Sequence, residues 1–394
     1  MHTFLSRHHT FSLADSQFMA QAIQLAGHGL YTTAPNPRVG CVLAQNNVLI
    51  ASGWHQKAGG PHAEIVALTA AGADARGATA YVSLEPCSHQ GRTPPCADAL
   101  IAAGVKRVVA AMVDPNPRVS GQGLKKLHEA GIDVSWGLLE DDAKALNPGF
   151  ILRMQEQGPW VRAKVASSLD GRSAMASGES KWITGPAARA DVQRWRAQSG
   201  ALVMGINSIL RDDPSMTVRQ HDWLGQLPEL WHTEPIQQPL RVVLDSHLRI
   251  PLSSKILAQD GKTLVITLPD TLEQQKHKVR QLSETGIDVV SGLPSGQRLD
   301  LTGVLQQLVQ RDINEVLVES GPTLTGAFLH EGLIDELILY MAPKLMGDQA
   351  QAAFILPGLE RINQCPPLRI KDIRQVGEDV RIIASPQRAD PHNN

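Results

Sequence analysis

Four side chains in the first quarter of the chain have types and spacing suited to zinc chemistry. His62 stands two residues before Glu64, and Cys87 and Cys96 follow. One imidazole and two thiolates leave one position of a tetrahedral zinc ion open for water, as in catalytic zinc sites. A carboxylate at Glu64 can accept a proton from that water and pass it to a departing amine. The set predicts hydrolytic deamination, with His62, Cys87 and Cys96 as zinc ligands and Glu64 as the catalytic residue.

The spacing of the two cysteines departs from the general zinc-deaminase pattern, His-x-Glu followed by Pro-Cys-x-x-Cys. Eight residues separate Cys87 from Cys96 here. A structural zinc ion and two incidental buried thiols therefore stay open as alternatives. Pro61 and the run 93–95 (Thr-Pro-Pro) end whatever precedes them, so His62 and Cys96 should each begin a helix. The helix dipole then favours the thiolate form of Cys96.

The elements around these residues alternate between helix and strand. Asp15 is expected to cap a helix that reaches the Gly-His-Gly run at 27–29. A hairpin of two short strands, 39–43 and 48–51, should follow it. The pattern then continues with a helix from 62, a strand at 79–84, a helix from 96, a strand at 107–113, a helix from 123 and a strand at 132–136. This alternation predicts a layered α/β domain with helices over a mostly buried sheet.

The second half repeats the alternation after a cluster of turn-forming residues at 147–149 and a polar segment at 155–159. We therefore expect two domains, 1–157 and 158–386. Strands of the second α/β domain are predicted at 160–165, 201–204, 240–244, 263–266, 315–318 and 337–340. Residues 220–239, rich in Pro, Gln and His, are predicted to be a surface insertion, and 387–394 a disordered tail.

The segment 315–326 combines an apolar strand, a glycine-containing turn and a helix start. Such a turn can hold a phosphate through backbone N–H groups and the helix dipole. The full Gly-x-Gly-x-x-Gly pattern is absent, so an ordinary strand-to-helix turn stays open as the alternative. The same holds for 204–208.

Composition limits the partners of the chain. Its 394 residues carry 37 Lys plus Arg against 39 Asp plus Glu, which gives no large positive field for nucleic acid. No apolar run approaches the roughly 18 residues of a membrane span. The N-terminal segment lacks an apolar signal region, so we expect a cytoplasmic protein. Four cysteines are too few for a disulfide framework, and Cys41 and Cys365 are expected to be a core and a loop residue.

Three runs around the zinc set carry a family resemblance: 35–40 (PNPRVG), 53–64 (GWHQKAGGPHAE) and 84–96 (LEPCSHQGRTPPC). They resemble the bifunctional deaminase and reductase of riboflavin biosynthesis, in which the long spacing of the cysteines is the normal form. In the second half, 164–172, 177–184 and 210–214 resemble that family's reductase domain. The resemblance extends from about Gln17 to Ala384. It implies a cytidine-deaminase-like α/β/α domain followed by a dihydrofolate-reductase-like α/β domain.

The resemblance also implies two reactions. The first is zinc-dependent hydrolytic deamination of 2,5-diamino-6-(5-phosphoribosylamino)pyrimidin-4-one. The second is reduction of the ribosyl group of the resulting 5-amino-6-(5-phosphoribosylamino)uracil to ribityl by NADPH. We expect one zinc ion per chain, a small phosphorylated pyrimidine substrate and a homo-oligomer. Two alternatives remain: a nucleoside or tRNA deaminase with a C-terminal ligand-binding domain, and a zinc-stabilised interaction protein without activity.

The resemblance extends to individual positions. It implies NADP contacts at Ala166, Trp182, Ser208, Asp212, Ser246, Gly321, Pro322, Thr323, Leu324, Thr325, Gly326 and Ala327. It implies substrate contacts at Asn36, Ser180, Arg196, Met216, Arg219 and Glu319, and His55, Lys57, His89 and Arg92 are candidates for the substrate phosphate. Asn36 could equally be a turn residue, Trp182 and Arg196 could be packing on a helix, and Asp212 could be a helix cap.

Overall fold

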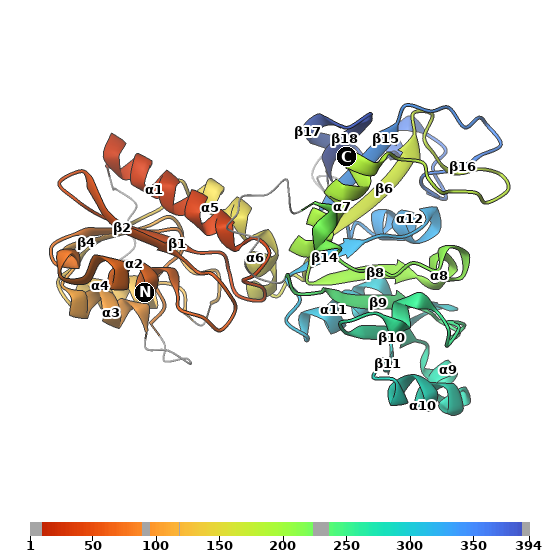
Figure 1. Cartoon of the computed structure of the whole chain (residues 1–394), viewed down its shortest axis with the longest axis horizontal. Helices are drawn as coiled ribbons and strands as arrows, with labels where there is room; N and C mark the ends of the chain where they lie inside the picture. Colours follow the sequence, from red (N-terminus) through yellow and green to blue (C-terminus); the bar gives the residue numbers. More distant parts are fainter. Residues whose placement is uncertain (1–9, 89–94, 118, 224–235, 388–394) are drawn as a thin grey trace. The chain divides into compact units, whose positions relative to one another are not determined.

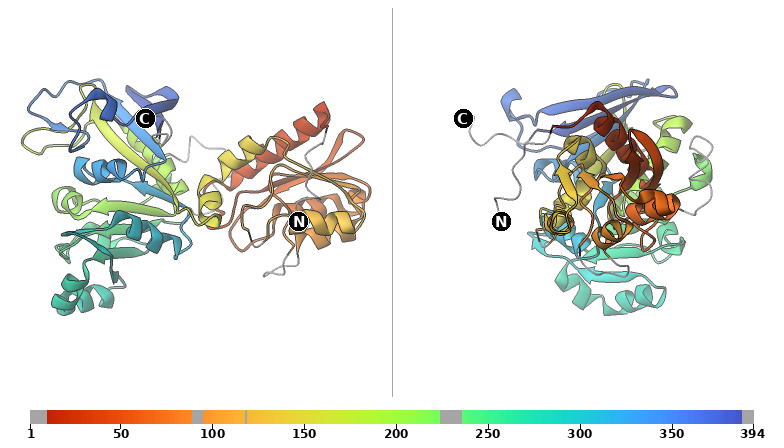
Figure 2. Two further views of the ribbon diagram at one scale, coloured as in Figure 1. Left: turned by 180° about the vertical axis from the view of Figure 1, so that it is seen from behind. Right: turned by 90° about the vertical axis from the view of Figure 1, so that its left-hand side faces the viewer.

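The computed structural model describes residues 10–88, 95–117, 119–223 and 236–387. The chain divides into two compact units, Met1–Gly158 and Pro159–Asn394, drawn in Figures 1 and 2. Each unit is an α/β structure and is described by itself.

The first unit is built on a five-stranded sheet in the order β2-β1-β3-β4-β5. Strand β1 runs antiparallel to its two neighbours, and β3, β4 and β5 are mutually parallel. The bounds are β1 (Gly40–Gln45), β2 (Val48–Trp54), β3 (Thr79–Val82), β4 (Arg107–Ala110) and β5 (Asp133–Trp136). All five predicted strands of this half are present.

Helices cover both faces of this sheet, as Figure 1 shows. One face packs against α2 (Ala63–Ala71), α3 (Cys96–Ala103) and α4 (Gln122–Glu129), with a core of small and branched apolar side chains. The other face packs against α1 (Leu13–Ala26), α5 (Glu140–Leu146) and α6 (Pro148–Met154). The predicted α/β/α layering is confirmed.

One local prediction is wrong in this unit. Ser12, not Asp15, is the N-cap of α1, and the Asp15 carboxylate accepts the Ser12 N–H at 2.8 Å in a capping box. The cluster at 147–149 does interrupt the helices, because Asn147 separates α5 from α6 and Pro148 is the first residue of α6. Proline fits there, since the first N–H of a helix has no intrahelical partner.

The second unit has a nine-stranded sheet in the order β11-β10-β9-β8-β14-β6-β15-β18-β17. The seven strands from β11 to β15 are parallel to their neighbours, and β18 and β17 are antiparallel. The bounds are β6 (Trp160–Ser168), β8 (Ala201–Gly205), β9 (Leu240–Leu244), β10 (Thr263–Thr267), β11 (Asp288–Ser291), β14 (Glu315–Val318), β15 (Glu336–Ala342), β17 (Leu368–Val376) and β18 (Asp379–Pro386). The six predicted strands are confirmed, whereas the hairpin β17–β18 was not predicted.

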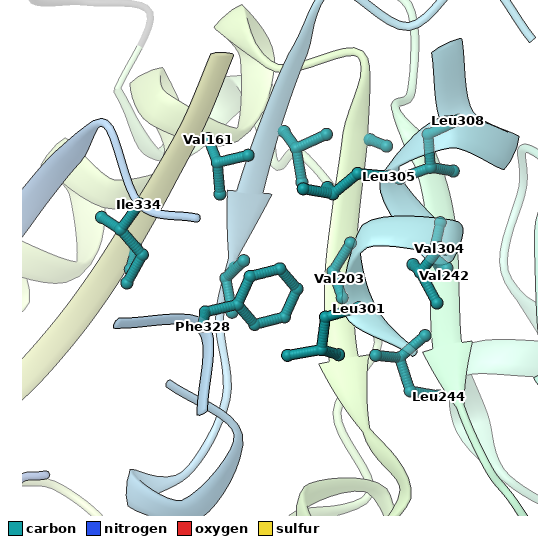
Figure 3. Close-up of a cluster of buried hydrophobic side chains, with 14 of the residues drawn as sticks. Val161, Val203, Val242, Leu244, Leu301, Val304, Leu305, Leu308, Phe328 and Ile334 are labelled. Carbon is teal, nitrogen blue, oxygen red and sulfur yellow. The ribbon is translucent and has the colours of Figure 1, made fainter. Parts of the chain in front are cut away.

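Helices again lie on both faces. On one face α11 (Leu301–Val309) and α12 (Pro322–His330) bury the cluster of Figure 3, in which Phe328 lies near Leu301 and Val203. On the other face α7 (Pro186–Gln198), α8 (Ile206–Asp212) and α10 (Lys276–Glu284) contribute to a second cluster. This unit also contains α9 (Pro269–Gln274) and two small two-stranded sheets, β7 (Arg172–Ala174) with β16 (Gln351–Ala352) and β12 (Pro294–Ser295) with β13 (Arg298–Leu299).

The predicted insertion at 220–239 falls largely outside the described residues. Its two described ends are anchored, because Trp223 and Ile236 are buried. The predicted tail beyond Gln387 also lies outside the described residues. Within the described part of the chain, no helix is both long and apolar enough to span a bilayer.

Candidate active sites

His62, Cys87 and Cys96 converge at the start of two helices in the first unit. His62 is the N-cap of α2 and Cys96 is the first residue of α3, as predicted. The Nδ1 atom of His62 lies 3.2 Å from Cys96 Sγ and 3.7 Å from Cys87 Sγ. With usual Zn–N and Zn–S bonds, a tetrahedral ion would separate such an N and S pair by about 3.6 Å. The geometry therefore fits a zinc ion held through Nδ1 and both sulfur atoms.

The electrostatics of the cluster distinguish its two thiols. The hydrogen bond with Cys87 and burial raise the pKa of Cys96, contrary to the thiolate expected there from the sequence, whereas the pKa of Cys87 is lowered. Hydrogen bonds from Cys96 and His62 lower the pKa of Cys87, and the backbone N–H of Cys96 donates to Cys87 Sγ at 3.2 Å. That N–H belongs to the first turn of α3, where orphan donors and the dipole favour a thiolate.

Glu64 lies within the first turn of α2, two residues after His62. Its side chain is 3 % exposed. Burial raises the pKa of Glu64 to about 7. A carboxyl group that lies beside a metal site and has a pKa near neutrality can both accept and donate a proton.

Asn36 and His55 form a linked pair in the same unit. The Nδ1 atom of His55 lies 2.9 Å from the carbonyl of Pro61, so the ring donates there. Its Nε2 is then an acceptor, and the Asn36 side-chain N–H donates to it at 3.1 Å. Burial lowers the pKa of His55, which favours this neutral ring. Because both ring nitrogens are used, His55 orients Asn36 rather than offering a donor to a phosphate.

Glu85 is a positioning residue that the sequence did not single out. Its carboxylate accepts backbone N–H groups from Asp114 at 2.9 Å, Gly121 at 2.9 Å and Gly123 at 2.8 Å. A Cβ on Gly123 would meet the carbonyl oxygen of Pro86 at 1.9 Å, so only glycine allows this approach. Glu85 thus ties the start of α4 to the peptide just before Cys87. The sequence signal that could have identified Glu85 is its place in the run Leu-Glu-Pro-Cys, two residues before Cys87.

The second unit contains a cavity of about 840 Å³ at the carboxyl ends of its parallel strands. Open α/β sheets bind ligands at this edge. Predicted cofactor and substrate positions that line it are Ala166, Ser180, Ser208, Asp212, Ser246, Glu319, Gly321, Pro322, Thr323, Leu324 and Ala327. Pro322 is the first residue of α12, whose N-terminus therefore opens on the cavity.

Lys164, on β6, and Glu319, just after β14, both line the cavity. Arg196 holds Glu319 through two hydrogen bonds of 2.6 and 2.9 Å, and Lys164 Nζ lies 3.5 Å from the same carboxylate. Despite burial, these cations lower the pKa of Glu319 to about 2. Glu319 is therefore ionised, and Lys164 is a cavity cation that sequence reasoning missed.

Comparison with known proteins follows the same division of the chain. A model described as the cytidine and deoxycytidylate deaminase zinc-binding region matches residues 13–112. The RibD C-terminal domain model matches residues 159–382. The riboflavin biosynthesis protein RibD of Escherichia coli is 48 % identical over 369 residues, which are 93 % of this chain and 98 % of that protein. The chain belongs to the RibD family.

Solved RibD structures agree with this assignment. Acinetobacter baumannii RibD, form 1, has a TM-score of 0.86 at 47 % identity and covers 95 % of this chain and 99 % of its own. The diaminohydroxyphosphoribosylaminopyrimidine deaminase/5-amino-6-(5-phosphoribosylamino)uracil reductase of Thermotoga maritima has a TM-score of 0.80 at 32 % identity and equal coverage. The predicted family, the two-part fold, the deaminase and reductase activities, and the zinc and NADPH cofactors are confirmed.

Some positions inferred from the RibD resemblance lie outside the residues that line the cavity. Met216 is 2 % exposed in the core, and Arg219 pairs with Asp222 at 2.7 Å. Trp182 is exposed and stacks under Arg189, whose guanidinium carbon is 4.6 Å from the ring centroid. Three further inferred positions that do not line the cavity are Arg196, Thr325 and Gly326. In the first unit Lys57 is exposed, and His89 and Arg92 lie outside the described residues.

Proposed function

We propose that the first unit deaminates 2,5-diamino-6-(5-phosphoribosylamino)pyrimidin-4-one and that the second reduces the ribosyl group of the product to ribityl with NADPH. The observation that carries this is the convergence of His62, Cys87 and Cys96 beside buried Glu64, in a chain whose other unit opens a large cavity at its sheet edge. The assignment of one reaction to each unit, 1–157 and 158–386, is part of the proposal.

In the deaminase site the three ligands leave room for a water molecule, and zinc, when bound, supplies Lewis-acid polarisation of that water. Glu64 takes up the proton and delivers it to the departing amine. The Asn36 amide nitrogen is engaged by His55, so its oxygen is turned to accept a hydrogen bond from the pyrimidine. By fixing the orientation of the Asn36 amide, His55 favours a pyrimidine that has a hydrogen-bond donor facing the Asn36 oxygen.

In the reductase site NADPH, when bound, supplies the hydride. The N-terminus of α12, with Gly321 as its N-cap, holds the pyrophosphate through backbone N–H groups. The Ser208 hydroxyl supports this loop by accepting the Gly321 N–H at 3.3 Å. Lys164 donates to ribosyl oxygen atoms in the same cavity. Arg196 acts through Glu319, which it keeps ionised and fixed in position.

We also propose that the protein works in the cytoplasm as a homo-oligomer. None of the four cysteines, which all lie within the described residues, is in a disulfide, and this suits a reducing compartment. Strand β17 is an edge of the nine-stranded sheet, and it exposes Leu368, Ile370 and Ile373. An exposed apolar edge strand is a template for pairing with a second copy. Sedimentation that finds a monomer at micromolar concentration would contradict this oligomer.

The proposal is tested by supplying the aminated phosphoribosyl pyrimidine with and without NADPH and identifying the products by mass. Without NADPH we expect ammonia release and the uracil derivative alone. With NADPH we expect that derivative to gain two hydrogen atoms as NADPH is consumed. Deamination without any NADPH oxidation would instead support the alternative of a single-activity deaminase with a ligand-binding domain.

A further inference from the structure

Asn147 lies at the joint between α5 and α6 and uses its side chain on a distant loop. Its Oδ1 atom accepts the backbone N–H of Arg38 at 2.8 Å, and its Nδ2 atom donates to the Arg38 carbonyl at 2.9 Å. Both residues are 6 % exposed, and they are 109 positions apart in the sequence. Because one partner group is a donor and the other an acceptor, the amide has only one favourable orientation. Asn147 therefore holds the backbone of Arg38 at two points in a buried place.

This asparagine does not serve its own helix in the usual way. Asn147 is the N-cap of α6, where an asparagine side chain normally accepts an N–H group of the first helical turn. Among the described residues at this joint, α6 has no side-chain cap, because the Asn147 amide is turned to Arg38. The Arg38 guanidinium makes a second tie by donating to the carbonyl of Leu146, the last residue of α5. A cation suits the carbonyl end of a helix.

Arg38 fixes Asn36, the proposed pyrimidine contact, through one intervening proline. Pro37 locks its own φ angle, so few backbone conformations join a fixed Arg38 to Asn36. On the other side, the Asn36 N–H donates to the Thr33 carbonyl at 2.8 Å. The Asn36 side chain is thereby carried to the ring of His55, to which its amide donates at 3.1 Å.

This anchor and the zinc set come from opposite faces of the sheet. Helices α5 and α6 pack on one face, whereas α2 and α3, which place His62, Glu64 and Cys96, pack on the other (Figure 1). The two Asn147 side-chain bonds go to Arg38 and to none of these residues. A change at Asn147 can therefore alter how the pyrimidine is held without altering the metal ligands or the proton carrier.

We propose that Asn147 is a positioning residue of the deaminase, which holds the loop 34–38 so that the Asn36 amide faces the pyrimidine ring. This inference rests on the proposed deaminase function. Without the Asn147 amide, the N–H and C=O groups of Arg38 lose their partners in a buried place, and the loop must move to pair them again. Asn36 then meets the ring in more than one orientation, which weakens substrate binding more than it slows the chemistry at zinc.

The test is steady-state deamination by the zinc-loaded full chain, with kcat and KM measured separately. We expect Asn147→Ala to raise KM by about 3–10-fold, the loss of one ordinary hydrogen bond between Asn36 and the ring, and to change kcat by less than about twofold. Asn147→Asp keeps the acceptor for the Arg38 N–H and should have an intermediate KM. Lys144→Ala is the matched control, since it removes an ion pair with Glu140 at the surface of α5 and should leave both constants unchanged.

A double-mutant cycle with Asn36→Ala separates positioning from general support of the fold. If Asn147 acts through Asn36, Asn147→Ala should add little to the KM of the Asn36→Ala variant, whereas independent effects would multiply. A readout that needs no substrate is the 15N NMR signal of His55 Nε2, which accepts from Asn36. We expect this signal to shift in Asn147→Ala and to stay in place in Lys144→Ala.

Three outcomes would overturn the assignment. An unchanged KM would mean that the loop does not need Asn147. Multiplied effects in the cycle would mean that Asn147 acts on binding by a route other than Asn36. Loss of zinc or of kcat in both Asn147 variants would make this residue a support of the whole unit. Failure of the unaltered chain to release ammonia from the pyrimidine would instead reject the proposed deaminase function, and the His55 signal would still decide whether Asn147 orients the loop.

Discussion

A buried carboxylate next to a metal ligand is costly unless it has a chemical task, and Glu64 illustrates this at the scale of single residues. Desolvation raises the pKa of Glu64, whose side chain is almost fully buried. A helix packed on a sheet would be more stable with an apolar side chain at that position. The proton transfer that we propose between water and a leaving amine at the neighbouring zinc site accounts for this position.

Changing Glu64 to Gln keeps the size of the side chain and removes its ability to carry a proton. We expect the variant to retain one zinc ion per chain, because His62, Cys87 and Cys96 are unaltered. Deamination should slow by roughly 10²–10⁴-fold, the usual contribution of general acid–base catalysis. Metal analysis and steady-state ammonia release check both parts, with exposed Glu129→Gln as the control. Near-normal turnover would remove Glu64 from the mechanism.

The same scale shows what residue types alone can predict. His62, Glu64, Cys87 and Cys96 could be found because few proteins combine these groups in this pattern without a metal. Lys164 could not be found from the sequence, because a single lysine in an apolar strand has no distinguishing spacing. Its role depends on Glu319, which is brought beside it by the parallel pairing of β6 with β14.

At the scale of elements, α4 is a helix whose N-terminal cap comes from a distant part of the chain. Gly121 stands at the N-cap position and has no side chain to offer. Glu85, 38 residues before Gly123, accepts the N–H groups of that helix start instead. One carboxylate therefore joins α4, the loop from Asp114 and the strand end that leads to Cys87.

Removing this brace should be far more harmful than removing an ordinary surface charge. Glu85→Ala leaves several buried N–H donors without a partner, and we expect a loss of roughly 2–4 kcal/mol of unfolding free energy. Glu129→Ala, in the same helix, removes an exposed pair with Lys125 and should cost less than about 0.5 kcal/mol. Urea denaturation of the zinc-loaded proteins measures both. Equal stability of the two variants would show that Glu85 is no brace.

Element prediction succeeded where the apolar pattern is continuous and failed where stabilising partners are remote. The parallel strands, buried on both faces, have short runs such as Glu315–Val318 that are typical of core strands. The hairpin of β17 and β18 was missed although β17 mixes charged and apolar residues, because nearly all residues of β17 are exposed and no buried face marks it. Its existence depends on pairing with β15 through β18, which local sequence does not encode.

At the scale of the whole molecule, the two chemistries use residues from separate compact units. The proposed zinc ligands all precede Gly158, and every residue that lines the cavity follows Pro159. The sequence could predict this division because the zinc set and the reductase-like stretches do not interleave. It could not predict how the intermediate passes from one site to the other, because that depends on the relative placement of the units.

The two activities should therefore be separable by single substitutions. Cys87→Ser removes a thiolate ligand, so we expect loss of zinc and of deamination, while the protein still oxidises NADPH when given the already deaminated phosphoribosylaminouracil. Cys365→Ser is the matched control, because Cys365 is an exposed free thiol and its loss should alter neither reaction. Metal content, ammonia release and NADPH absorbance measure the three quantities independently.

If the Cys87 variant stays folded, by circular dichroism, yet loses NADPH oxidation as completely as deamination, the two reactions share a site or a conformational step. The division of function between the units would then be wrong, whereas a selective loss of deamination means that each unit completes its own chemistry on a substrate taken from solution.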